Sequence, residues 1–156
     1  MPRVGFSPIA AGSIVFGKDG RWYCDGEPIP NRAIASLFSR ALEVLPDGRA
    51  RLVLGEDRAW VTLEDTPWVV TGIDGDPALG FAVALNDGTR EPLDPGSLRT
   101  GSDHVLYCRV KDGAHEARFL RPAYYALMRF AEPGPGDACE LPVGRGRRIT
   151  LNGQSG

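Results

Sequence analysis

Glycine and proline interrupt this chain at short intervals, and this spacing limits its possible folds more than any other feature. The 156 residues include 20 glycines and 13 prolines. Both residues end regular elements more readily than they extend them. Asp-Gly, a dipeptide typical of tight turns between antiparallel strands, occurs six times. We therefore expect many short strands joined by turns.

The stretch 59–70 has the clearest strand pattern. One face of such a strand carries Val61, Leu63 and Asp65, and the other carries Trp60, Thr62 and Glu64. Pro67 cannot donate to a ladder, so we expect the strand to bend there and resume at Trp68. Two interpretations of Asp65 are open. It caps the Thr66-Pro67 turn through backbone N–H groups, or it is held beside a cleft.

Two segments have the apolar spacing of helices. Residues 31–43 begin with Asn31, a suitable N-cap, and residues 122–131 begin with Pro122, which suits a first helical turn. The apolar positions are Ile34, Leu37, Phe38, Ala41 and Leu42 in the first segment, with Leu45 in the same spacing just beyond it, and Tyr124, Leu127, Met128 and Ala131 in the second.

Strand patterns fill most of the remaining chain. They cover residues 14–16, 21–24, 50–54, 59–63, 68–71, 81–85, 104–110, 115–120, 138–143 and 148–151. The segment 91–101 has few apolar anchors, so we expect a mobile loop there. Turn residues cluster at 74–77 and predict a boundary near 74–79.

These patterns predict an α+β fold with two β-rich halves. Residues 1–75 contain the helix at 31–43, and residues 76–156 contain the helix at 122–131. We expect the two halves to pack as one cooperative unit. Both halves show the order strand, Lys-Asp-Gly turn, strand, loop, helix and strand pair, with turns at 18–20 and 111–113. Either an internal duplication or the chance recurrence of Asp-Gly explains this order.

Composition excludes several classes of function. The net charge of −2 gives no electrostatic reason to expect a nucleic-acid partner. No run reaches the 18 apolar residues of a membrane span, and glycine, serine and proline interrupt the N-terminal segment 1–16 too often for a signal peptide. Cys24, Cys108 and Cys139 are an odd number in no close spacing, which fits reduced thiols in a cytoplasmic protein.

Metal, cofactor and catalytic motifs are not found in the sequence. His104 and Cys108 on one strand face would lie about 13 Å apart, too far to share an ion. Residues 74–76 begin like a calcium loop but lack its later ligands. There is no phosphate-binding P-loop, dinucleotide fingerprint or nucleophile elbow, so we expect no cofactor. Residues 144–148, Gly-Arg-Gly-Arg-Arg, either hold a phosphate or form a solvated hairpin tip.

Two arginines stand where helix electrostatics disfavour a cation. Arg32 and Arg121 fall at or just before the first turn of their helices, where the macrodipole is positive. They are either exposed or paired with a carboxylate, or they converge with free N–H groups on an anion. For a ligand site in a groove between the halves we expect Trp22 and Trp68 as walls, Arg32 and Arg121 as anion holders, and Glu64 and Asp65 as positioning carboxylates.

Several segments match a known family in order and spacing over about residues 14 to 72. They are Asp19-Gly20-Arg21-Trp22-Tyr23, Gly26-Glu27-Pro28-Ile29, Leu37-Phe38, Pro46-Asp47-Gly48 with Leu52, and the run from Val61 to Trp68. Through them the chain resembles the bacterial family called domain of unknown function 1285 (DUF1285). The resemblance implies an α+β fold of two similar halves, the second like a pleckstrin-homology barrel, and a regulatory or signalling role.

The function we expect is binding of a small molecule, with anions among the candidates, without catalysis. Two alternatives are open: a protein-interaction domain, or an enzyme that uses Asp65 and Glu64. The partner is therefore a small-molecule ligand or another protein.

Overall fold

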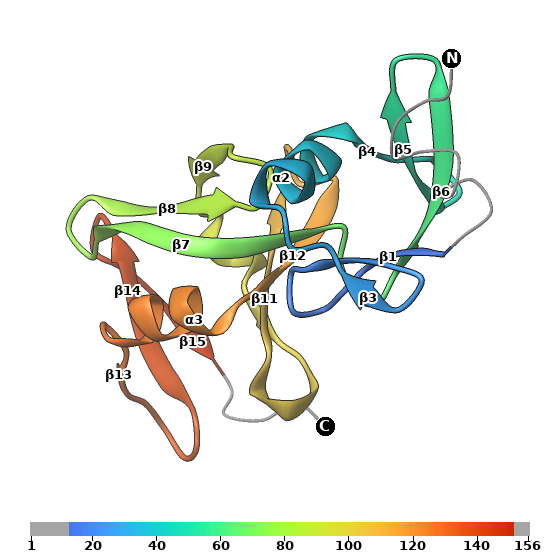
Figure 1. The fold of residues 1–156 in the computed structure, drawn as a ribbon. Coiled ribbons are helices and arrows are strands. Elements are labelled where there is room, and N and C mark those ends of the chain that lie inside the picture. Colours follow the sequence, from blue (N-terminus) through green and yellow to red (C-terminus); the bar gives the residue numbers. More distant parts are fainter. Residues whose placement is uncertain (1–12, 152–156) are drawn as a thin grey trace. The chain divides into compact units, whose positions relative to one another are not determined.

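The computed structural model describes residues 13–151, and the chain divides into two compact units, Met1–Pro67 and Trp68–Gly156 (Figure 1). The segment 1–16, in which we expected no signal peptide, lies largely outside the described residues. We placed the boundary between the halves near 74–79. The chain passes from one unit to the other at Pro67, and residues 74–79 belong to a hairpin of the second unit.

The first unit is a six-stranded sheet with one helix. Its elements are β1 (Ile14–Phe16), β2 (Trp22–Cys24), β3 (Glu27–Pro28), α2 (Arg32–Ala41), β4 (Leu42–Val44), β5 (Ala50–Leu54) and β6 (Asp57–Leu63). The strand order is β3-β2-β1-β6-β5-β4. All neighbouring strands are antiparallel except β1 and β6, which run parallel in the middle of the sheet.

Helix α2 begins as predicted and ends earlier. The side chain of Asn31 accepts hydrogen bonds from the backbone N–H groups of Ala33 and Ile34, so it is the N-cap. We expected the helix to reach residue 43, but Leu42 has extended backbone angles and pairs with Leu52. The strand pairing buries Leu42, which is 8% exposed, and this outweighs the continued helical spacing of its side chain.

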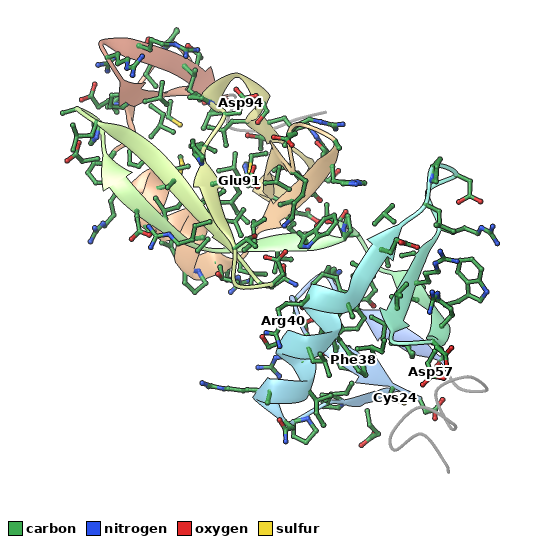
Figure 2. All side chains as sticks on the ribbon, turned by 90° about the horizontal axis from the view of Figure 1, so that it is seen from above. Cys24, Phe38, Arg40, Asp57, Glu91 and Asp94 are labelled. Carbon is green, nitrogen blue, oxygen red and sulfur yellow. The ribbon has the colours of Figure 1, made fainter. Side chains whose placement is uncertain are left out.

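Trp22 is at the centre of the first unit's core. Its ring lies 4.8 Å from that of Phe16 and 5.5 Å from that of Phe38, and its Nε1 donates to Ser39 Oγ over 2.9 Å. Figure 2 shows Phe38 on the side of α2 that faces the strands of this unit, with Arg40 on the other side. The hydrogen bond to Ser39 satisfies the only polar atom of the indole side chain within an apolar core.

The second unit contains a six-stranded sheet, one α-helix and a separate three-stranded sheet. Its elements are β7 (Trp68–Asp76), β8 (Gly80–Leu85), β9 (Arg90–Pro92), η1 (Pro95–Ser97), β10 (Arg99–Thr100), η2 (Ser102–His104), β11 (Leu106–Val110), β12 (His115–Phe119), α3 (Arg121–Met128), β13 (Glu132–Pro133), β14 (Cys139–Gly144) and β15 (Arg147–Leu151). The large sheet has the order β10-β11-β12-β7-β8-β9, and the small sheet has the order β13-β14-β15.

The two large sheets share one topology. Each consists of two three-stranded meanders, joined by a parallel pair between the first strand of one meander and the last strand of the other. The α+β class, the two similar halves and one main helix in each are therefore confirmed. The helices differ in position, because α2 joins the meanders of the first unit whereas α3 follows the last strand of the second unit's large sheet. The likeness of the second half to a pleckstrin-homology barrel stays a prediction.

The two Lys-Asp-Gly turns are not equivalent in this topology. The turn at 18–20 joins the first two strands of its sheet, whereas the turn at 111–113 joins the last two. Their backbones also differ. Gly20 alone has a positive φ in the first turn, but Lys111, Asp112 and Gly113 all have one in the second. The two large sheets have the same topology, but the two Lys-Asp-Gly turns do not occupy equivalent positions in it.

Two further segments differ from expectation. His104 lies in η2 with a φ of +62°, so it does not share a strand face with Cys108. The segment 91–101, expected to be a mobile loop, contains the end of β9, η1 and all of β10. Leu93 anchors this segment, because its side chain is buried and its N–H donates to the Phe81 carbonyl over 2.9 Å.

Candidate functional site

The first unit holds four of the six predicted site residues. Trp22 is 1% exposed and belongs to the core described above. Arg32 is exposed at the start of α2 and makes no ion pair with a residue in 13–151. Glu64 is exposed, and its carboxylate accepts a hydrogen bond from the Lys18 N–H over 2.9 Å. It therefore holds the β1–β2 turn, while Asp65 is half-buried just after β6.

The second unit holds the other two predicted residues. Trp68 is 8% exposed; its ring lies 5.1 Å from that of His115, and the Lys111 Nζ lies 5.2 Å from its centre. Arg121 is exposed at the first position of α3 and makes no ion pair within 13–151. Because the six residues divide between two units, the groove expected between the halves stays a prediction.

A charged cluster beside Trp68 has a structural role. The buried Asp87 carboxylate accepts from Lys111 Nζ over 2.6 Å and from Thr89 Oγ1 over 2.6 Å. Burial alone would raise the pKa of Asp87, but the hydrogen bonds from Lys111 and Thr89 and the Lys111 charge hold that pKa below its ordinary value. Burial lowers the pKa of His115, with help from the charges of Arg109 and Lys111. Asp87, Thr89 and Lys111 satisfy one another, so they tie the β8–β9 turn to the end of β11.

A cavity of about 500 Å³ lies within the second unit, and we call it the arginine-lined cavity. The β7–β8 hairpin, β9, the start of η1 and the β14–β15 turn line it, and it is open to solvent. Its lining consists of Asp74, Gly75, Leu79, Gly80, Phe81, Ala82, Pro92, Leu93, Pro95, Val143, Gly144, Arg145 and Arg147. The volume falls in the usual range of small-molecule sites.

Two walls of this cavity meet where Gly80 and Gly144 approach each other closely. Gly144 has a φ of +106°, and a Cβ added to it would lie 2.9 Å from the Gly80 N and 3.0 Å from the Gly80 Cα. The small sheet therefore touches the β7–β8 hairpin backbone to backbone, which only glycine permits. The hairpin and the β14–β15 turn both line the cavity beside this contact.

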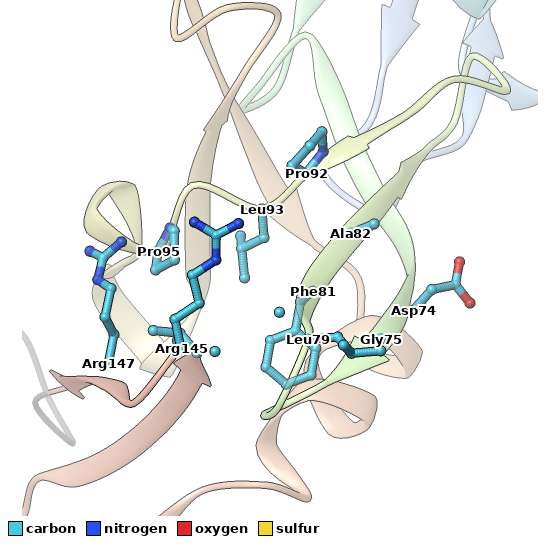
Figure 3. A pocket seen from close by; sticks show the side chains of 13 residues that line it. Asp74, Gly75, Leu79, Phe81, Ala82, Pro92, Leu93, Pro95, Arg145 and Arg147 are labelled. Carbon is cyan, nitrogen blue, oxygen red and sulfur yellow. The ribbon is translucent and has the colours of Figure 1, made fainter.

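Apolar side chains and two guanidinium groups line the cavity. Phe81, Leu93 and Val143 are each buried and form its apolar part. Figure 3 shows the Arg145 guanidinium extending towards Leu93, with Arg147 beside it. Both arginines are exposed, and neither makes an ion pair or hydrogen bond with a side chain in the described residues. The cavity is therefore apolar in its depth and cationic on one wall.

Asp74, the carboxylate among the lining residues, does not neutralise the charges of Arg145 and Arg147. Asp74 points away from the cavity in Figure 3 and forms an ion pair with Arg90 of β9, two strands away in the sheet. The next arginine of β15, Arg148, pairs with Glu132 and Glu140 of the small sheet and does not line the cavity. Arg145 and Arg147 thus differ from their neighbours in having no acidic partner among residues 13–151.

A second cavity, of about 390 Å³, lies at the start of α3, and we call it the α3 pocket. It is lined by Asp103, His104, Val105, Leu106, Arg118, Phe119, Arg121, Tyr124 and Tyr125. Of the six predicted site residues, Arg121 lines a cavity in the described structure. The α3 pocket is more polar than the arginine-lined cavity, because it has an acidic residue, a histidine and two tyrosines beside its two arginines.

The described residues include neither a cluster that could hold a metal ion nor a reactive thiol. No group of three or more His, Cys, Asp or Glu residues within 13–151 is placed to hold a metal ion. Cys24, Cys108 and Cys139 are free thiols, and burial raises the pKa of Cys108 to about 12, so this thiol is not a nucleophile at neutral pH. No helix in the described part of the chain is long and apolar enough to cross a membrane.

The sequence indicated the charged half of the arginine-lined cavity but not the apolar half. The run 144–148 was interpreted either as a phosphate loop or as a solvated hairpin tip, and it is a hairpin tip that lines a cavity. Phe81, Leu93 and Val143 belong to three distant segments, and no local pattern indicated that they would meet. The glycine pair at 80 and 144 could be recognised only once the strands were placed.

The fold is similar to those of two proteins of known structure. The chain resembles a DUF1285 family protein from Silicibacter pomeroyi DSS-3, with a TM-score of 0.67 and 22% identity over 90% of this chain and 78% of that one. It also resembles a DUF1285 family protein from Shewanella baltica OS155, with a TM-score of 0.59 and 20% identity over 77% of this chain and 93% of that one. No protein-family model and no curated protein matches the sequence. At this identity the comparison shows that the chain has the DUF1285 fold, and the resemblance seen in the sequence is confirmed at that level.

Proposed function

We propose that the second unit binds a small anionic ligand in the arginine-lined cavity and does not catalyse a reaction on it. The observation that carries the proposal is the pair of guanidinium groups, Arg145 and Arg147, which have no acidic partner among the described residues and stand beside an apolar wall. A guanidinium group presents a planar fork of donors that matches carboxylate and phosphate oxygens.

Electrostatics favours an anion at this wall. The two arginines are separated by one residue at a hairpin turn, so their like charges repel each other. Asp74 is neutralised by Arg90, which leaves the positive charge of the wall uncompensated by the lining. An anion between the two guanidinium groups would remove this repulsion and form charge-assisted hydrogen bonds. Each such bond contributes about 1.5–3 kcal/mol.

The lining favours binding over catalysis. Among its side chains there is no serine, threonine, cysteine, histidine, lysine or tyrosine, so the usual nucleophiles and general bases are missing from it. The carboxylate of Asp74 is committed to Arg90. The enzyme alternative rested on Glu64 and Asp65, and Glu64 has a structural partner in the Lys18 N–H.

The test is an NMR titration of the full chain with octanoate and with octanol, which differ in charge and share an apolar chain. We expect octanoate to shift the backbone amides of residues 79–82, 92–95 and 143–147, and octanol to shift them much less. The double variant Arg145→Gln/Arg147→Gln should weaken octanoate binding at least tenfold, because it removes at least one charge-assisted contact.

Two control variants show whether a loss of octanoate affinity is specific to Arg145 and Arg147. Arg148→Gln removes an arginine from the same strand outside the cavity and should leave the octanoate affinity within about twofold. Arg121→Gln removes an arginine of the α3 pocket and should also have little effect. If Arg121→Gln abolishes binding while the double variant does not, the anion site is the α3 pocket. If none of the variants changes the affinity, binding does not depend on these arginines and the proposal is wrong.

A further inference from the structure

We infer that the arginine-lined cavity takes an amphiphilic acid, that is, a single carboxylate or phosphate monoester on an apolar alkyl or aryl body. This inference rests on the proposed function and narrows the class of ligand. It excludes polar anions such as sugar acids, sugar phosphates and nucleotides. The charged side chains of the lining that lack an ionic partner among the described residues support it, because both lie on one wall.

The deep part of the cavity offers almost no side-chain hydrogen-bonding capacity. Phe81, Leu93 and Val143 are 7%, 7% and 6% exposed, and alanine and two prolines complete the lining near them. Proline has no backbone N–H to donate. The Leu93 N–H donates to the Phe81 carbonyl over 2.9 Å, so this backbone pair is already used. Hydroxyl groups of a ligand would leave water there without gaining a protein partner.

The polar anchors are confined to one wall. Arg145 lies in the turn after β14 with a φ of +55°, and Arg147 begins β15. Figure 3 shows both side chains on the same side of the cavity, facing Pro95 and Leu93. A ligand that satisfies this arrangement has its charge at one end and an apolar body at the other. A polyanion, with charges spread along its length, would place some of them against Phe81.

The mouth of the cavity extends the apolar surface. Leu79, at the tip of the β7–β8 hairpin, is 85% exposed and lines the cavity. A ligand that covers part of this side chain removes apolar area from water, which favours binding. An alkyl chain that runs from the arginines past Phe81 would reach this side chain, so affinity should rise with chain length through Leu79.

The experiment compares acids of increasing chain length by NMR titration of the full chain, each below its micelle-forming concentration. Burial of one methylene group is worth about 0.8 kcal/mol, which is about fourfold in affinity. Octanoate should therefore bind about 16-fold more tightly than hexanoate. Gluconate has the same number of carbons as hexanoate and carries hydroxyl groups along its chain, and we expect it to bind far more weakly. Octyl phosphate, compared with octanoate, distinguishes the two head groups.

A surface variant tests the route of the chain without disturbing the core. Because Leu79 is so exposed, Leu79→Ser should leave the fold intact and reduce the gain from octanoate to decanoate, while the hexanoate affinity stays the same. Tyr125, 61% exposed in the α3 pocket, provides the matched control. Tyr125→Ser should leave every affinity unchanged.

The outcomes separate this inference from the proposed function. If gluconate binds as tightly as hexanoate, chain length has no effect, and Arg145→Gln/Arg147→Gln still abolishes binding, the cavity is an anion site but the amphiphile inference is wrong. If none of the acids binds, or if the arginine variants bind them equally well, both are wrong. If affinity increases steadily with chain length, and this increase depends on both arginines and on Leu79, the result supports both the proposed function and the amphiphile inference.

Discussion

Gly144→Ala should separate the small sheet from the β7–β8 hairpin, because the residue is constrained in two independent ways. Its φ of +106° disfavours any side chain, which costs about 1–2 kcal/mol for an ordinary residue in left-handed conformation. The added Cβ would also lie 2.9 Å from a backbone atom of Gly80, and an overpacked contact costs about 1–3 kcal/mol. The sum is a loss of about 2–5 kcal/mol.

Gly136→Ala is the matched control for this prediction. Gly136 lies in the turn between β13 and β14 with a φ of +60°, and an added Cβ would meet nothing within 4 Å. It therefore carries the conformational cost, about 1–2 kcal/mol, without the steric one. Native-state hydrogen exchange of the β14 and β15 amides in the full chain measures both losses as a lower free energy of opening. Equal losses in the two variants would show that the close approach at Gly80 does not hold the sheet.

Three further predictions concern residues outside the cavity. Ser39→Ala leaves the indole N–H of Trp22 buried without its acceptor and should lower the free energy of unfolding by about 1–3 kcal/mol in urea titrations; a change below about 0.3 kcal/mol would contradict the geometry. Asn31→Ala removes the cap of α2 and should cost about 1 kcal/mol in the same assay, partly recovered in Asn31→Asp. Because the pKa of Asp87 is lowered by Lys111 in the folded chain, its stabilisation is present above the ordinary carboxyl pKa of about 3.9 and is lost as pH falls through the lower folded value. The loss of stability below about pH 4 should be smaller in Asp87→Asn than in the parent protein, and an unchanged pH profile would show that this carboxylate is not linked to folding.

Local patterns were enough to predict most of the elements. The helical spacing with Asn31 as cap located α2, and the alternation of residues 60–65 correctly separated the exposed face, with Trp60 53% exposed, from the buried face, with Val61 9% exposed. The end of α2 was missed because the pairing of Leu42 with Leu52 is a tertiary event. Local spacing cannot show which of two competing structures buries a side chain better.

The candidate site was much less predictable. Trp22 has the chemistry of a ligand wall, but the same size and apolarity make it the natural centre of a core. Glu64 looked available for chemistry because its hydrogen-bond partner, the Lys18 N–H, is 46 positions away in the sequence. The arginine-lined cavity needs segments around residues 80, 93 and 145 to meet, and the shared topology of the sheets could not be deduced from the Lys-Asp-Gly turns.

The most direct test of the central claim is the behaviour of the arginine side chains themselves. The Nε–H resonances of Arg145 and Arg147 should shift during a titration of the full chain with octanoate, with one common dissociation constant. Those of Arg121 and Arg148 should remain unchanged. Shifts of similar size at all four arginines, or none at Arg145 and Arg147, would contradict an anion site in the arginine-lined cavity.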